Sequence, residues 1–566
     1  MSRIHRHLWQ RFGAIAIPYW FSRERWRARG LLALLVLLLI GQAVSNVLFN
    51  EQSGEFTSAL AAKDAQRFWR SIYQCVVMLI VAVPIYSLYY FVRDKLAIYW
   101  RRWLTEKMLD KYFTDRAYFE LNSNVNIDNP DQRISEDINT FTQKSLYFLL
   151  ILLGALIQLV AFCGVLWSIS RPLVYFLVIY TFVGTVVTAV LFGRILIGLN
   201  FLQLKREADF RFGLVRVREN AEAIALYQGE EQEASQVKQR FDQAFLNFNK
   251  LILWQLNLNT FQYAYSFLTI FIPSAIVASR VMSGELEVGR AIQAAGAFAA
   301  ILSALAIMVD NFDNLTRFAA GINRLDTFAR ALAGDTPGRP IADSVIASVQ
   351  DSRLALEHVI LQTPDYKRTL VTGLSVAVDQ GQGLMIVGPS GGGKSSLLRA
   401  IAGLWNSGTG SIVRPPLKDM LFLPQRPYMI MGSLRSQLLY PNVKRKVTDD
   451  ELLELLETVN LPYIAERFGG LDVELDWGKV LSVGEQQRVA FARVLLAQPL
   501  YALLDEATSA LDVRNEERLY RRLKATSTTV VSVSHHATIV KYHHQVLELS
   551  GDGKWELHPA KGYSLG

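Results

Sequence analysis

Cysteine is nearly absent from this chain. Its 566 residues include only two cysteines, Cys75 and Cys163, and both lie in apolar runs. Two thiols are too few for a disulfide framework or a cysteine-based metal cluster, so both kinds of small stapled fold are excluded. We predict that the two side chains are inert packing residues.

A strong charge of either sign is also lacking. The formal net charge is +8, and charged residues make up 19% of the chain. We therefore expect no nucleic-acid partner, because basic segments that flank a membrane explain the excess better.

Hydrophobic residues, in contrast, are abundant. They make up 51% of the chain, and the mean hydropathy is positive. This surplus indicates membrane spans and a lipid bilayer as a partner. The length also calls for two or more domains.

A cleavable signal peptide is not recognisable, because the first long apolar run begins near Gly30, behind a basic and aromatic leader. Within this leader, residues 15–29 combine Pro18 and several aromatic residues with arginines. Such a stretch suits a helix that lies in the membrane interface before the first span, or simply a basic flank.

Six apolar segments have roughly the length of about 20 residues that a spanning helix needs. They lie near residues 31–48, 72–91, 146–169, 173–192, 261–278 and 291–309. The last is rich in alanine and interrupted by polar residues, which suits a helix that lines an aqueous cavity. The most polar residues near these spans are Gln74, Gln158, Gln262, Gln293 and Asp310. They are either substrate contacts or hydrogen-bonding groups between helices.

The basic residues predict the orientation. They concentrate in the leader and in the two long segments after the second and fourth spans. By the positive-inside rule, both chain ends and both long segments are expected in the cytoplasm. Each segment exceeds about 50 residues, so we predict that the spans continue as helices into the cytoplasm. The clusters at residues 128–133 and 219–224 are either contact points for an ATPase domain or solvated turns.

The composition changes after residue 330. We predict a transmembrane domain over residues 1–330, a linker over 331–346 and an α/β domain over 347–566, where short β-rich runs alternate with helical segments.

The C-terminal domain contains a phosphate-binding pattern, G-x-x-x-x-G-K-S, at residues 388–395. It follows an apolar strand-like run and opens a helix-forming run, as a nucleotide-binding loop should. Lys394 is expected to reach the β- and γ-phosphates of ATP, and Ser395 to bind Mg²⁺. The alternative is a glycine-rich turn that binds nothing. The predicted nucleotide contacts are Gly388, Pro389, Ser390, Gly391, Gly392, Gly393, Lys394, Ser395 and Ser396.

Two carboxylates follow a second apolar strand, at residues 500–504. Ligands of open α/β sheets bind where such strands end. Asp505 is suited to hold Mg²⁺ through water, and Glu506 to act as the general base that polarises the attacking water.

A third motif, Leu-Ser-Val-Gly-Glu-Gln-Gln-Arg at residues 481–488, resembles the signature motif of ABC transporters. The rest of that family's set follows in order. The resemblance implies nucleotide contacts at Ser482, Gly484 and Glu485. It implies a γ-phosphate sensor and metal contact at Gln425, a D-loop at residues 509–512, and a switch histidine at His535 rather than His536.

Two positions depart from the family pattern. Val483 replaces a usual glycine and Glu485 a usual glutamine, but Ser482 and Gly484 are kept, so we expect a working site. The adenine-stacking tyrosine of the family falls near Thr363, and Tyr366 is the candidate to replace it.

Further segments resemble subfamily D, which includes the bacterial YddA- and BacA-like ATP-binding permeases and the peroxisomal fatty-acyl-CoA transporters. They include residues 424–429 and 501–509 in the ATPase half, and 128–134 and 222–227 in the membrane half. The resemblance implies an exporter-type membrane α-helical fold joined to an α/β P-loop ATPase. It also implies a head-to-tail homodimer, with Lys394 of one chain and Ser482 of the other around each ATP.

These features predict a homodimer that hydrolyses ATP to move a large amphipathic or hydrophilic solute, of cobalamin, peptide or fatty-acyl type. We expect it in a bacterial inner membrane. Two alternatives are a membrane-anchored ATP sensor or ATP-gated channel with little hydrolysis, and a proton-coupled carrier with a regulatory ATPase domain.

Overall fold

The computed structural model describes residues 2–122, 129–334 and 345–564. The chain forms two compact units, Met1–Thr336 and Pro337–Gly566.

The described residues of the first unit form helices joined by short turns. Its helices are α1 (Ser2–Trp20), α2 (Arg25–Ala61), α3 (Ala65–Phe113), α4 (Ala117–Asn122), α5 (Pro130–Gln132), α6 (Ile138–Ile169), α7 (Arg171–Val187), α8 (Arg194–Glu219), α9 (Ala221–Tyr227), α10 (Glu230–Met282), α11 (Val288–Asp310) and α12 (Phe312–Ala331). Short π-helical segments at Arg133–Asp137 and Thr188–Gly193 precede α6 and α8.

Five of the described helices are long and apolar enough to cross a membrane. They are the stretches Arg25–Ala61, Ala65–Leu121, Pro130–Ile169, Glu230–Met282 and Val288–Leu305. A shorter apolar helix, Arg171–Gly184, overlaps the first part of the fourth predicted span, residues 173–192. The prediction of a membrane α-helical first half is therefore confirmed.

The N-terminal helix differs from the predicted stretch of residues 15–29. Helix α1 ends at Trp20, a turn follows, and α2 begins at Arg25. One face of α1 is buried at Ile15, Ala16 and Tyr19, and the Tyr19 ring stacks on Trp100 of α3 at 5.5 Å. The leader is thus packed against the bundle, because its aromatic residues find partners there.

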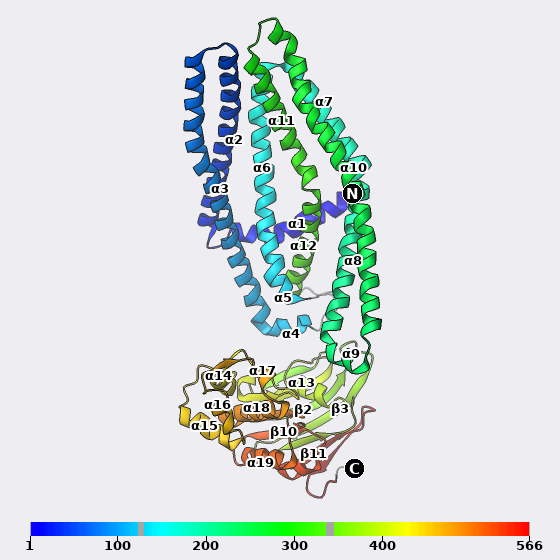
Figure 1. Ribbon diagram of the computed structural model, residues 1–566. Coiled ribbons are helices and arrows are strands. Elements are labelled where there is room, and N and C mark those ends of the chain that lie inside the picture. Colours follow the sequence, from blue (N-terminus) through cyan, green and yellow to red (C-terminus); the bar gives the residue numbers. More distant parts are fainter. Residues whose placement is uncertain (1, 123–128, 335–344, 565–566) are drawn as a thin grey trace. The chain divides into compact units, whose positions relative to one another are not determined.

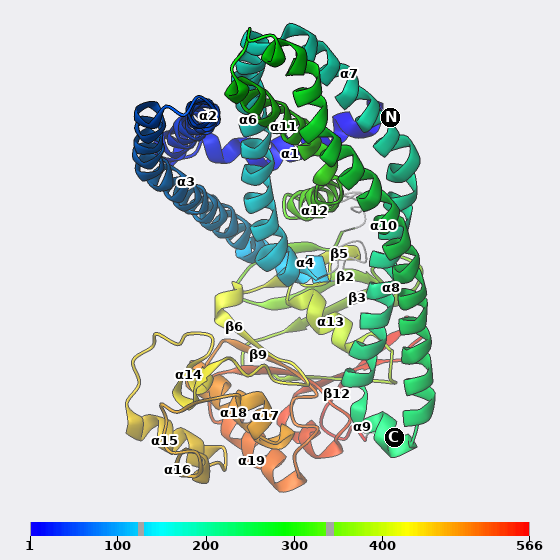
Figure 2. The ribbon, with the colours of Figure 1, turned by 45° about the horizontal axis from the view of Figure 1, so that its top comes forward.

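The two long segments form helices that run far beyond a membrane's thickness. Helix α10 has 53 residues, and it runs beside α8 along much of its length (Figure 1, Figure 2). Between them the short helix α9 exposes Leu226 and Tyr227. The cluster at 219–224 forms the end of α8 and the start of α9. In the other cluster, Asp128 lies outside the described residues, and Asn129 precedes α5.

A reciprocal tyrosine pair joins two apolar helices, α7 and α10. The rings of Tyr180 and Tyr265 stack at 4.2 Å, and each hydroxyl donates a hydrogen bond to the other residue's backbone carbonyl, at 2.6 and 2.9 Å. Hydroxyls in an apolar environment need such partners. Among the predicted polar positions, Gln293 accepts a bond from Arg290 at 2.9 Å, and the side chain of Asp310 lies outside the described part of the chain.

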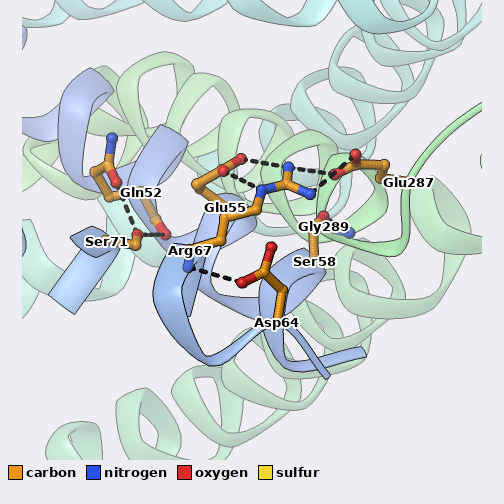
Figure 3. Close-up of polar contacts among 8 residues, drawn as sticks. All are labelled: Gln52, Glu55, Ser58, Asp64, Arg67, Ser71, Glu287 and Gly289. Atoms are coloured by element: carbon orange, nitrogen blue, oxygen red, sulfur yellow. Dashed lines mark hydrogen bonds and ion pairs between the residues drawn. The ribbon is translucent and has the colours of Figure 1, made fainter. Parts of the chain in front are cut away.

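A polar cluster closes the end of the α2–α3 hairpin (Figure 3). The guanidinium of Arg67 pairs with Glu55 of α2 and with Glu287, in the turn before α11, at 2.5 and 2.8 Å. Beside it, Ser58 accepts a hydrogen bond from the backbone N–H of Gly289 at 3.0 Å. The cluster therefore connects the first hairpin to the turn between α10 and α11.

Next to this cluster, α2 and α11 approach so closely that no side chain fits between them at Gly289. A Cβ added there would lie 1.9 Å from the carbonyl oxygen of Gly54 and 2.4 Å from the hydroxyl of Ser58. Small residues at such crossings let membrane helices pack backbone to backbone.

Replacing Gly289 by leucine is therefore expected to destabilise the first unit, because the helices must separate to admit the side chain. Overpacking of this kind typically costs about 1–3 kcal/mol or more. We expect a lower thermal unfolding midpoint and less monodisperse protein in detergent. Gly164→Leu is the matched control, because a Cβ at Gly164 in α6 meets nothing within 4 Å. Equal behaviour of the two variants would contradict the proposed crossing.

The second unit is built around two main sheets. The strands are β1 (Ala347–Gln350), β2 (Leu354–Gln362), β3 (Thr369–Val378), β4 (Leu384–Val387), β5 (Gly408–Arg414), β6 (Met420–Leu423), β7 (Gly432–Ser433), β8 (Glu474–Leu475), β9 (Tyr501–Asp505), β10 (Thr529–Val533), β11 (Gln545–Leu549) and β12 (Trp555–Pro559). The helices are α13 (Lys394–Ile401), α14 (Leu434–Leu439), α15 (Asp449–Thr458), α16 (Tyr463–Arg467), α17 (Trp477–Val480), α18 (Val483–Ala497) and α19 (Val513–Lys524).

The six-stranded sheet has the order β12-β11-β4-β10-β9-β6, and its strands from β11 to β6 are parallel. Buried apolar residues form a core on each of its faces. The register pairs Val533 of β10 with both Ile386 of β4 and Asp505 of β9, and Leu423 of β6 with Leu504. All four strands therefore end at the same edge, where ligands bind in open α/β sheets.

Candidate nucleotide-binding and catalytic site

The phosphate loop, residues 388–395, joins the buried strand β4 to α13. Its glycines are required by shape at two positions. Gly388 has φ +141°, and a Cβ there would lie 2.2 Å from the carbonyl oxygen of Leu549; Gly393 has φ +96° and closes the loop onto the helix. Backbone N–H groups at a helix start favour an anion. The geometry thus suits a phosphate chain.

Lys394 lies along this loop. Its ammonium donates hydrogen bonds to the carbonyls of Gly388 and Pro389, at 2.7 and 3.0 Å, and the residue is buried. Burial lowers the pKa of Lys394, and the negative charges of Glu506 and Asp505 partly offset this effect. A dehydrated ammonium held over the loop is well placed to neutralise phosphate oxygens.

Ser395 and Asp505 meet across the sheet edge. The serine hydroxyl donates a hydrogen bond to the aspartate carboxylate at 2.9 Å. Burial raises the pKa of Asp505; the bond from Ser395 opposes this rise and the neighbouring Glu506 adds to it. A divalent cation would satisfy such a buried oxygen pair, since hard cations prefer oxygen ligands.

Glu506 stands at the centre of the site. One carboxylate oxygen accepts a hydrogen bond from the side-chain amide of Gln425 at 2.9 Å, and the other lies 3.5 Å from Nε2 of His535. Its backbone has φ +47°, which costs a non-glycine residue about 1–2 kcal/mol. Its N–H donates to the carbonyl of Val533, at the end of β10. Strain held by such surrounding contacts is typical of functional positions.

The two neighbouring histidines contact different carboxylates. Whereas His535 faces Glu506, Nδ1 of His536 lies 2.9 Å from Glu516 of α19. The structure therefore brings His535, and not His536, to the predicted base.

The signature segment begins helix α18. Ser482 is its N-cap residue, and Ser482 and Glu485 form a reciprocal capping box. The Glu485 carboxylate is buried and also accepts a hydrogen bond from the Tyr463 hydroxyl at 2.9 Å. Burial alone would raise the pKa of Glu485, but the bonds from Ser482, the bond from Tyr463 and the charge of Arg467 together lower it. The described contacts of Ser482 are thus within its own helix turn, and Glu485 caps that turn.

The structure places Gly484 beside the D-loop and Tyr366 in the hairpin of β2 and β3. A Cβ at Gly484 would lie 3.1 Å from the carbonyl of Ala510, so the signature helix starts beside the D-loop. Tyr366 lies in the turn between β2 and β3, half-buried and with φ +57°. The second strand of this hairpin, β3, starts next to the phosphate loop. A Cβ added at Gly393 would lie 3.1 Å from the side chain of Leu370 in β3.

Gln487 has a structural role that the sequence motifs did not predict. It is fully buried, its amide N–H donates to the carbonyl of Gln425 at 3.2 Å, and its oxygen accepts from the N–H of Ala510 at 3.0 Å. It therefore joins the signature helix to the backbone of Gln425 and to the D-loop. One signal was available: Gln487 shares a helical stripe with apolar Ala490, Phe491 and Val494, where a polar side chain needs buried partners.

Together the groups at this edge can perform phosphoryl hydrolysis. A loop and a lysine suit the phosphates, a hydroxyl–carboxylate pair suits a cation, and a carboxylate with an amide and an imidazole suits the attacking water.

Comparisons with known proteins agree with this geometry. Residues 14–282 match the family model "ABC transporter transmembrane region 2", and residues 371–509 match the model "ABC transporter". An uncharacterised ABC transporter ATP-binding protein of Synechocystis is 47% identical over 546 residues, which cover 95% of this chain and 82% of the relative.

Two eukaryotic relatives also span nearly the whole chain. The chloroplastic ABC transporter D family member 2 of Arabidopsis thaliana is 39% identical over 96% of this chain and 86% of its own length. The human lysosomal cobalamin transporter ABCD4 is 33% identical over 96% of this chain and 94% of its own.

These matches confirm the family that the signature motif and its companions indicated, and with it the exporter-type fold and the ATP-binding, ATP-hydrolysing second unit. The chain belongs to the ABC transporter family, as a subfamily D protein in which a transmembrane unit is joined to an ATPase unit.

Proposed function

We propose that the protein works as a homodimer of half-transporters, which moves a large amphipathic or hydrophilic solute across a membrane by ATP-driven alternating access. One observation carries this proposal furthest. Glu506 lies in contact with both Gln425 and His535, within a chain that also carries membrane-spanning helices. A complete water-activating group indicates turnover rather than ATP binding alone.

Within the site, Lys394 and the loop N–H groups bind the phosphates. Ser395 and Asp505 would hold Mg²⁺, with Gln425 as a further contact, and the ion would supply positive charge at the β- and γ-phosphate oxygens. Glu506 accepts a proton from the attacking water, and His535 holds the far side of that carboxylate.

Each ATP in this proposal lies between Lys394 of one protomer and the signature helix of the other, with Ser482 and Gly484 at the γ-phosphate. Tyr366 is the proposed contact of the adenine ring. The start of α18 supports the dimer, because Val483 is exposed there and a helix N-terminus favours an anion such as the partner's γ-phosphate.

The bound γ-phosphate favours the closed dimer, and hydrolysis removes that bias. The long helices α3, α8 and α10 would carry the change to the spans. Both chain ends are proposed to lie in the cytoplasm, and the membrane is proposed to be a bacterial inner membrane.

The solute is proposed by class. The human relative is named a lysosomal cobalamin transporter, so a cobalamin-like compound is the first candidate. Peptides and fatty-acyl derivatives are the others, on the strength of the subfamily resemblance.

Transport and ATPase assays of the purified protein in lipid vesicles test this proposal. We expect ATP hydrolysis that one of the three solute classes stimulates, and ATP-dependent flux of that solute. ATP binding with little hydrolysis would favour a sensor or an ATP-gated channel. Flux that persists in Lys394→Ala vesicles under a pH gradient would favour a proton-coupled carrier.

A further inference from the structure

Glu516 is a buried carboxylate that the hydrolytic mechanism above does not use. It lies in α19, its residue is fully buried, and three side chains donate hydrogen bonds to it. Burying an ionised carboxylate is costly, and it is tolerated where several donors surround the charge. Such an arrangement holds its donors firmly in place.

The three donors come from the two segments that carry the catalytic pair. Thr508 follows Glu506 by two residues, and its hydroxyl donates to Oε1 of Glu516 at 2.6 Å. His536 is the residue after His535, and its Nδ1 lies 2.9 and 3.1 Å from the two oxygens of Glu516.

The third donor lies two residues further along the second segment. The hydroxyl of Thr538 donates to Oε2 at 2.8 Å. One oxygen of Glu516 thus contacts the segment after β9, and both contact the segment after β10. The carboxylate of Glu516 therefore connects the segment that follows Glu506 to the segment that follows His535.

We propose that Glu516 is a positioning residue for ATP hydrolysis, which fixes the separation of 3.5 Å between Glu506 and His535 by binding Thr508 on one side and His536 and Thr538 on the other. Glu516 itself touches neither substrate nor the reacting atoms. Its effect passes through the two segments that it connects, and it should be felt in turnover rather than in ATP binding.

The first test is Glu516→Gln in the full-length protein in lipid vesicles. The amide keeps the shape but replaces one acceptor oxygen with a donor, so at least one of the two segments loses its bond. Because a misplacement of 1 Å can cost about 10²-fold in rate, we expect kcat to fall by about 10-fold or more while the KM for ATP stays within about twofold.

Glu517→Gln is the matched control. Glu517 is the next residue of the same helix, it is more exposed, and it pairs with Lys541, so it also connects α19 to the segment after β10. We expect this variant to keep the wild-type kcat. An equal loss in both variants would overturn the proposal, because any link between α19 and that segment would then suffice.

A double-mutant cycle separates positioning from general stability and does not depend on the folding of Glu516→Gln. Thr508→Val and Thr538→Val each remove one donor, on opposite sides of the carboxylate. We expect their effects on kcat to be non-additive, since Thr508→Val releases the segment after β9, and Thr538→Val then has no connection left to weaken.

In a Glu516→Gln background that folds, neither threonine variant should lower kcat further. Strictly additive effects of Thr508→Val and Thr538→Val would overturn the proposal. So would a parallel fall of ATP affinity, thermal midpoint and kcat in Glu516→Gln, because a merely structural role moves all three together.

Discussion

Glu506→Gln is expected to lower ATP turnover by about 10²-fold or more while ATP still binds. General-base help is typically worth about 10²–10⁴-fold, and the amide cannot accept the proton of the attacking water. The side chain keeps its length, so Gln425 can still donate to its oxygen across the 2.9 Å contact. Phosphate release in lipid vesicles measures turnover, and equilibrium binding of ATP measures affinity.

The matched control is Glu474→Gln, an exposed glutamate on β8. It should leave both quantities unchanged. If Glu506→Gln instead turned over ATP as fast as the wild type, another group would be the base. Asp505 is then the next candidate by position, although its bond to Ser395 at 2.9 Å suits a metal ligand better.

The local elements of the ATPase unit could be predicted because their signals are short-range. The apolar run before Gly388 forms the buried strand β4, and the run before Asp505 forms β9. The sequence did not indicate the order of the strands within the sheet. Strand β10 lies between these two, although it is last of the three in sequence, and it carries His535 to Glu506.

Side-chain partners were harder to predict than positions. From chemistry alone, Glu485 could face a nucleotide or cap its own helix, and the choice depends on where Tyr463 and Ser482 fall in space. Gln487 lies in the signature motif without an assigned role, and Glu516 lies outside every motif that the sequence analysis named. Their partners lie 8 to 62 residues away in sequence, and that proximity arises only after the strands have paired.

The membrane half shows the same division. Span positions follow from the thickness of the bilayer, which makes about 20 apolar residues a readable signal. The pairing of Gly54 with Gly289 and of Tyr180 with Tyr265 cannot be predicted in this way. Lipid and protein interior are equally apolar, so hydrophobicity does not distinguish the helix faces that pack together.

The largest effect that tests the proposed dimer comes from placing two defects in the same protomer or in opposite ones. Lys394→Ala removes the phosphate-binding ammonium, and Val483→Glu puts a negative charge at the start of α18. Val483 is half exposed, and an acidic residue is favourable at a helix start. A chain that carries Val483→Glu should therefore fold normally. Tandem-linked dimers that also carry Glu506→Gln hold ATP without hydrolysing it, which removes any coupling through turnover.

Each head-to-tail site combines one protomer's Lys394 with its partner's Val483. With the two changes in opposite protomers, both defects fall in one site and the other stays intact, so we expect one ATP retained per dimer. With both changes in one protomer, each site carries one defect, and none should be retained. Retained ATP per dimer after rapid desalting measures this difference. The reverse pattern would mean that each chain completes its own site, because the two defects would then spoil the same site only when they lie in the same protomer.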